Sequence, residues 1–217
     1  MANSDANIRL IETLGSDLRP VRRLAAPGWR ALLWLAVVAA VAVAMVFYGD
    51  AGEMIRRFAM APDLSLSFVG SALTAIAAAI AAFELGLPDR KPIWALLPLP
   101  PAVLWFGASG IGCFRSWLVP HTTLVSVGDA MDCWTFIVGM SLPLSAVLIV
   151  MLRRGYALQP VLTAAIGGLA CAAAAATLLN FVHPFDASAI DLLFHSLAVG
   201  MVAFVIAMIG GRILRKR

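Results

Sequence analysis

The run ALLWLAVVAAVAVAMVFY, residues 31–48, contains no charged side chain. It is long enough to cross the hydrocarbon core of a bilayer as a single helix, which takes about 17–25 apolar residues. Its hydrophobicity is continuous, whereas a strand of a membrane β-barrel alternates over about 10 residues. The run therefore predicts a transmembrane helix and not a barrel strand.

Five further apolar runs of this kind follow along the chain. They cover residues 64–83, 93–112, 134–152, 158–179 and 192–209. Polar stretches with charged residues, proline or glycine separate the runs. The sequence therefore predicts an all-α integral membrane protein, in which a six-transmembrane-helix bundle over residues 31–217 follows a cytoplasmic tail over residues 1–30.

Composition excludes several other classes of protein. Of the 217 residues, 62% are hydrophobic and 13% are charged, against about 45–50% and about 25% in soluble globular proteins. A soluble single domain is therefore excluded, and so is a disordered chain, which needs the opposite bias. Three cysteines in a chain of this length also exclude a disulfide-dense secreted scaffold.

The distribution of charge predicts how the chain crosses the membrane. Basic residues mark the cytoplasmic side, and six spans place both termini on the same side. Thirteen of the 16 lysines and arginines fall on the side of the termini, while seven of the 12 acidic residues fall on the other. We therefore expect both termini in the cytoplasm. Basic helix ends bind anionic lipid, so the lipid bilayer explains the net charge and direct binding of nucleic acid is not expected.

The tail has an amphipathic pattern. Ile8, Ile11, Leu14 and Leu18 recur at spacings of three and four, which predicts one apolar stripe on a short helix that Asp5 could cap. An isolated helix of this length is marginal in water. The stripe therefore needs a partner, which could be the lipid surface, the loops of the bundle or a groove on another protein.

Two features inside the spans bear on assembly and transport. The fifth span is rich in small residues, and a face with Gly168 and Ala172 leaves a homo-oligomer open. The third span contains Pro98, Pro100 and Pro101, and a broken helix can line a transport site. Ion and proton pathways usually need ionisable residues inside the membrane, and no run has one near its middle.

Polar residues that could support chemistry gather on the outer face. Thiolates and imidazoles suit zinc or copper, but no tight metal-ligand spacing is present, so metal binding stays open and no cofactor is expected. A disulfide between the two outer cysteines is a further alternative. A small transporter or membrane enzyme using this face is the alternative function, although no catalytic motif supports an enzyme. The candidate residues are Cys113, Cys133, His183, Asp186 and His195.

The tail sequence LGSDLRPVRRL, residues 14–24, resembles the opening of the NrsF family, the negative regulators of sigma F. Members of this family are bacterial inner-membrane anti-sigma factors with six spans. The likeness extends along nearly the whole chain through the order and spacing of several segments. These are the Pro-rich third span, Gly112-Cys113, Asp132-Cys133, MLRRG at residues 151–155, Asp186 and His195.

The resemblance implies a regulator without catalysis. The tail would hold an extracytoplasmic-function sigma factor at the membrane, and a stress signal at the periplasmic face would release it. Most of the expected partner-binding residues fall on the family's motif, and two arginines are added because of their charge. The set comprises Leu14, Asp17, Leu18, Pro20, Val21, Arg22, Arg23 and Leu24.

The family is also associated with a pair of periplasmic cysteines as its sensing element. Cys133 occupies the first of these positions, and His183 lies where the second cysteine is expected. The resemblance therefore leaves three alternatives open. Cys133 could pair with Cys113, bind a soft metal together with His183, or have no sensing role.

Overall fold

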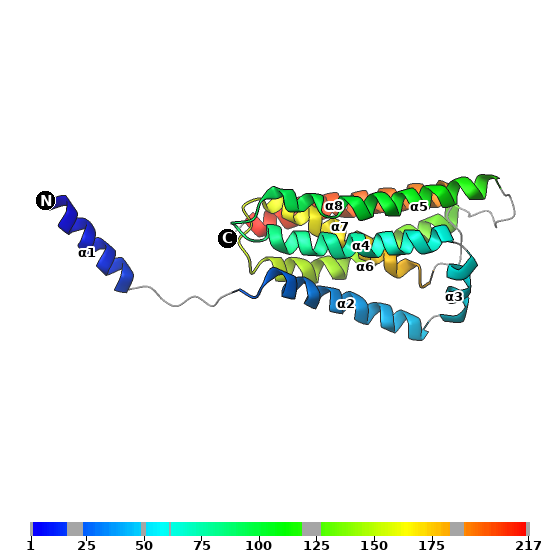
Figure 1. Ribbon diagram of the computed structural model, residues 1–217, viewed down its shortest axis with the longest axis horizontal. Helices are drawn as coiled ribbons and strands as arrows, with labels where there is room; N and C mark the ends of the chain where they lie inside the picture. The colour runs from blue at the N-terminus through cyan, green and yellow to red at the C-terminus, as the bar shows by residue number, and fades with distance from the viewer. Residues whose placement is uncertain are drawn as a thin grey trace.

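The computed structural model describes residues 2–16, 24–48, 51–60, 62–118, 127–182 and 189–215. Within these ranges every regular element is a helix. The long helices run side by side as one bundle, and α1 lies apart from them (Figure 1). The elements are α1 (Ala2–Ser16), α2 (Pro27–Tyr48), α3 (Ala51–Met60), α4 (Pro62–Leu85), η1 (Pro92–Leu96), α5 (Leu99–Leu118), α6 (Val127–Leu152), α7 (Pro160–Leu179) and α8 (Ala189–Arg215).

Six helical segments of the described chain are long and apolar enough to cross a membrane, and they match the six predicted runs. They are Pro27–Phe47, Pro62–Leu85, Pro92–Ile111, Met131–Leu152, Pro160–Leu179 and Leu192–Arg215. The predicted all-α, six-helix fold is thereby confirmed. Four of these segments begin with proline. Proline fits the first turn of a helix because the amide hydrogen that it lacks would have no helical partner there.

Helix α7 packs against α4, α6 and α8 and forms the centre of the bundle. The residues Ala172–Ala176 are all buried. A Cβ atom on Gly168 would lie 2.9 Å from the Cα atom of Ala203 in α8, so the two backbones touch at this glycine. Such close packing is a main attraction between helices in lipid. The small-residue face that left a homo-oligomer open is therefore used inside the chain.

Helix α2 lies at the edge of the bundle, where two long side chains attach it. Trp34 is fully buried, and its Nε1 donates a hydrogen bond to the carbonyl oxygen of Leu144 in α6 at 3.1 Å. Arg30 is also buried. Its guanidinium donates to the carbonyl oxygen of Met151 and lies 4.9 Å from the ring centre of Phe83. Arg30, which the sequence groups with the basic residues of the tail, thus joins α2 to α6 and α4.

The third predicted span is divided between η1 and α5. Pro98 lies in the turn between the two helices, and Pro100 and Pro101 fall in the first turn of α5, where proline is tolerated. The break therefore lies near one end of the span. Broken helices that line transport sites are interrupted near the middle of the membrane, so these prolines do not form a site of that kind.

Helix α3 lies in the connection between the first two spans, where the sequence had given no prediction of a helix. The ring of Phe58 packs edge-on against Phe68 of α4 at a centroid distance of 5.2 Å, and Phe68 packs against Phe181 at 5.9 Å. The Oγ atom of Ser65 donates to the carbonyl oxygen of Phe58 at 2.9 Å. These contacts fasten α3 across one end of the bundle (Figure 1).

Candidate functional site

The tail forms the helix α1, and its apolar stripe is exposed. Ile8, Ile11 and Leu14 are 50%, 68% and 61% exposed. The helix begins at Ala2, so Asp5 lies within its first turn and does not precede it. A carboxylate in the first turn still interacts favourably with the helix dipole. The predicted stripe is therefore present over these three residues, and the described part of the chain leaves it largely exposed.

Two of the predicted partner-binding residues can be placed in the structure. Leu14 lies in the last turn of α1, and Leu24 lies just before α2 and is 38% exposed. Both flanks of the predicted binding segment are thus accessible to a partner. The remaining members of the set fall outside the described residues, namely Asp17, Leu18, Pro20, Val21, Arg22 and Arg23.

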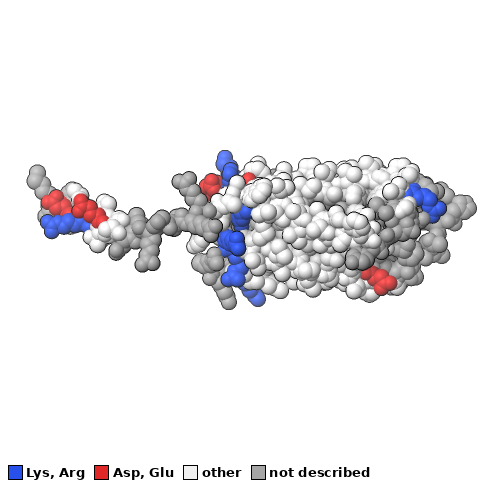
Figure 2. All heavy atoms as spheres, turned by 90° about the horizontal axis from the view of Figure 1, so that it is seen from below, with Lys and Arg blue, Asp and Glu red and all other residues white. Residues whose placement is uncertain are grey.

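Basic side chains gather at the end of the bundle from which the chain leads to α1 (Figure 2). One of them, Arg90, forms an ion pair with Glu84, with 2.9 Å between Nε and Oε2. A concentration of positive charge at one end is the asymmetry that marks the cytoplasmic side of membrane proteins. We name this the basic end, and its described basic residues are Arg30, Arg90, Lys91, Arg153, Arg154, Arg212 and Arg215.

Two loops at the basic end are held together through their backbones. The amide of Tyr156 donates to the carbonyl oxygen of Gly86 at 3.1 Å. A Cβ atom on Gly155 would lie 2.5 Å from the same oxygen, so a larger residue would push the loops apart. The Oγ1 atom of Thr163 donates to the carbonyl oxygen of Leu85 at 3.2 Å. These contacts make the loop after α4 and the loop after α6 one connected framework.

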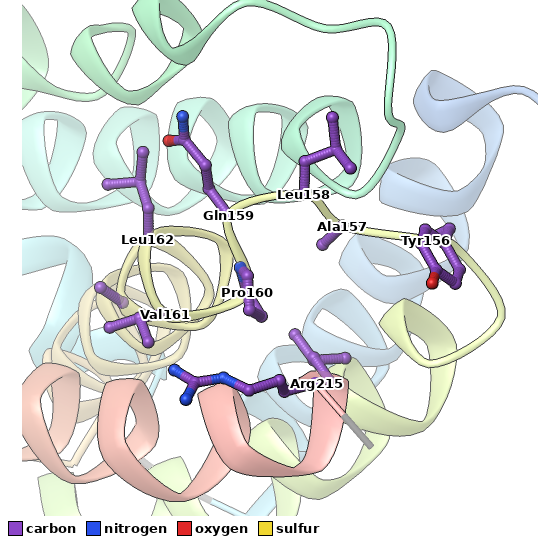
Figure 3. A pocket seen from close by; sticks show the side chains of 10 residues that line it. Tyr156, Ala157, Leu158, Gln159, Pro160, Val161, Leu162 and Arg215 are labelled. Carbon is purple, nitrogen blue, oxygen red and sulfur yellow. The ribbon is translucent and has the colours of Figure 1, made fainter. Parts of the chain in front are cut away.

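A groove of about 790 Å³ lies beside this framework (Figure 3). It is bounded by the loop between α6 and α7, by the first turns of α7 and by the end of α8. Sequence reasoning missed this groove because its two walls are far apart along the chain. We name it the basic-end groove, and the residues that line it include Tyr156, Leu158, Val161, Leu162, Leu214 and Arg215.

The opposite end of the bundle, which we name the far end, carries α3 and the described members of the predicted sensing set. Cys133 is buried near the start of α6, and His195 is half-buried near the start of α8. The rings of Trp134 and Phe194 pack edge-on at a centroid distance of 6.4 Å. This contact places the helical turn of Cys133 beside the turn of His195, a juxtaposition that the sequence predicted only as far as a shared face.

Among the described members of the predicted sensing set, the structure shows neither a disulfide nor a cluster of metal ligands. Cys113 lies near the end of α5, and no disulfide joins it to Cys133 in the structure. Across the described ranges, no three His, Cys, Asp or Glu residues come together as metal ligands would. His183 and Asp186 fall outside the described residues.

Comparison with known proteins places this chain in a family. Residues 14–215 match the family model described as negative regulator of sigma F. The comparisons with curated proteins and with solved structures found no match. The family description names a regulator and implies a sigma factor as its partner. Because the match covers nearly the whole chain, from the end of α1 to the end of α8, this protein belongs to the NrsF family of negative regulators of sigma F.

Proposed function

We propose that this protein is a membrane-bound anti-sigma factor that sequesters an extracytoplasmic-function sigma factor through its N-terminal tail. The observation that carries the proposal is the exposed apolar stripe of α1. This helix lies apart from the bundle, whose six long helices are apolar enough to cross a membrane (Figure 1). An amphipathic helix of this kind binds by laying its apolar face into a groove on a partner. Family membership supplies the class of partner.

The proposed location is the bacterial inner membrane, with both termini in the cytoplasm. The basic end supports this orientation, because positive residues are retained on the cytoplasmic side. The tail leaves the bundle at that same end (Figure 2). A sigma factor bound to the tail would be held at the membrane, away from RNA polymerase.

The proposed contact surface runs from the end of α1 into the segment before α2. Apolar residues would supply most of the binding free energy, because burying a leucine or valine side chain contributes about 1.5–3 kcal/mol. The arginines would meet acidic groups on the sigma factor or anionic lipid headgroups. The proposed contacts are Leu14, Asp17, Leu18, Pro20, Val21, Arg22, Arg23 and Leu24.

The proposed input is a stress signal received at the periplasmic far end. Cys133 and His195 lie on adjacent turns of α6 and α8, and both helices extend from the far end to the basic end. Helix α6 ends where Arg30 donates to the carbonyl oxygen of Met151. A displacement of α6 would therefore be passed by a direct contact to the start of α2, which follows the tail in the chain. Cys113, His183 and Asp186 complete the proposed sensing set.

Replacing Leu14 by aspartate tests the proposed contact. We expect Leu14→Asp to weaken capture of the sigma factor by about 10–100-fold, the equivalent of the 1.5–3 kcal/mol that burial of a leucine contributes. The measurement is an affinity pull-down of the solubilised full-length chain from its host, with the bound proteins identified and quantified by mass spectrometry. Transcription from promoters that depend on the sigma factor should rise in the same variant.

Thr13→Asp is the matched control, because Thr13 lies on the face of α1 opposite the stripe and is also exposed. It should capture the sigma factor as the unmodified chain does. The proposal is contradicted if the folded, unmodified chain captures no sigma factor, or if the Leu14 and Thr13 variants capture it equally well.

A further inference from the structure

Two apolar surfaces of the same chain are exposed, one on α1 and one at the basic end. One is the stripe of α1, formed by Ile8, Ile11 and Leu14. The other is the basic-end groove, where Tyr156 and Leu158 are 61% and 66% exposed. A groove of about 790 Å³ is large enough to take several apolar side chains of a helix. The apolar face of α1 and the apolar lining of the groove could therefore cover each other.

The tether between the two surfaces is long enough to bring them together. Residues 17–26 separate α1 from α2, and ten residues reach at most about 33–36 Å. The distance to be covered is limited, because Arg30 near the start of α2 donates to Met151, which precedes Tyr156 of the groove by five residues. A tether of ten residues is short enough to give an effective concentration of roughly millimolar order, so even a weak contact would be well populated.

The charges around the two surfaces are complementary. Asp5 and Glu12 fall on one side of the stripe of α1, and the last turn of α1 contains no basic residue. One basic residue, Arg215, lines the groove, and Arg212 lies in the same last turn of α8. Figure 3 shows the side chain of Arg215 extended along the edge of the groove. An acidic amphipathic helix is therefore favoured over a basic one as the occupant.

We propose that α1 docks into the basic-end groove whenever no sigma factor is bound, so that the groove and the sigma factor compete for the same stripe. The arrangement in Figure 1, with α1 away from the bundle, is then the state open to a partner. Docking itself follows from the two surfaces, the tether and the charges. The competition rests in addition on the proposed function.

Cysteine cross-linking in the full-length protein tests the docked state. The pair Ile11→Cys with Leu158→Cys should form a disulfide on mild oxidation in phosphatidylcholine vesicles, with the product assigned by mass spectrometry. We expect about tenfold more of it than from Thr13→Cys with Leu158→Cys, which uses the opposite face of α1, or from Ile11→Cys with Lys91→Cys, which uses the basic end outside the groove.

Three results would overturn docking. Equal yields from the three pairs would mean that α1 samples the basic end without a preferred site. A product found only between differently tagged copies would mean that the occupant is a second chain. Loss of the product when phosphatidylglycerol is added to the vesicles would mean that an anionic lipid holds the groove.

A second arm separates docking from the proposed function. Adding the sigma factor recovered in the pull-down should lower the yield of the Ile11–Leu158 product in proportion to its binding. An unchanged yield in the presence of bound sigma factor would overturn the competition while leaving docking supported. Failure to recover any sigma factor would contradict the proposed function, but the cross-link without it would still support docking.

Discussion

Helices α7 and α2 are both long enough to cross a membrane, yet the bundle holds them in opposite ways. In the most apolar stretch of each helix, 67% of the residues are buried in α7 and 17% in α2. Helix α7 touches its neighbours through glycine and alanine along its length. Helix α2 has its two deeply buried long side chains, Trp34 and Arg30, near one end, and its later turns pack through partly buried residues such as Val41 and Met45. The tail is therefore joined to a helix that is much less buried in the bundle than α7.

The largest effect should come from removing the principal side chain that fastens α2. Trp34→Ala should cost about 3–5 kcal/mol of packing free energy, as large-to-small substitutions of buried aromatic residues do. Hydrogen exchange should increase across α2 and remain slow in α7. Trp29→Ala, in the same helix at a side chain that is 56% exposed, is the control. Equal acceleration in α2 and α7 would show that the two helices are not independent in stability.

An intermediate effect is expected from crowding α7 against α8. Gly168→Ala places a Cβ atom 2.9 Å from the Cα atom of Ala203, where backbone must move. Overpacking of this kind costs about 1–3 kcal/mol, which thermal unfolding in detergent would detect. A Cβ atom on Gly200 meets nothing within 4 Å, so Gly200→Ala in α8 should leave the unfolding temperature nearly unchanged. A larger loss from Gly200→Ala would refute this account of the contact between α7 and α8.

The smallest effect should come from the polar contact between α7 and α4. The Oγ1 atom of Thr177 donates to the Oγ atom of Ser71 at 3.0 Å. Hydrogen bonds between membrane helices contribute about 0.6 kcal/mol on average, so Thr177→Val should lower stability by about that amount in the same unfolding assay. Thr135→Val is matched, because the hydroxyl of Thr135 donates to the carbonyl oxygen of Met131 in its own helix. A loss well above 1 kcal/mol would mean that polar contacts rival small-residue packing in holding α7.

The six spans and the stripe of α1 could be predicted because hydrophobicity and its period are properties of short segments. Helix α3 also had a local signal, since Ile55 and Phe58 are spaced three apart among charged residues. The segment is short and polar enough to resemble a connecting loop. Its packing on Phe68 supplies what the local pattern lacks.

The burial of Arg30 and the existence of the groove could not be predicted in this way. The contacts of Arg30 with the carbonyl oxygen of Met151 and the ring of Phe83 join it to segments that lie far away in the sequence. Leu158 begins the fifth predicted span and Leu214 follows the sixth, and only the packing of α7 on α8 brings them to one groove. Contacts between distant segments determine both features, so no window of sequence contains them.

The alanine run of α7 has a consequence for how the protein can respond to a signal. Alanine has no side-chain rotamers, so little conformational entropy is lost when residues 172–176 are buried. For the same reason this part of the interior cannot absorb a change by switching rotamers. Sliding or tilting of whole helices is therefore favoured over local rearrangement within α7. Under the proposed function, a disturbance at the far end would then reach the basic end as a displacement of whole helices, which is the form in which a groove between helix ends can open or close.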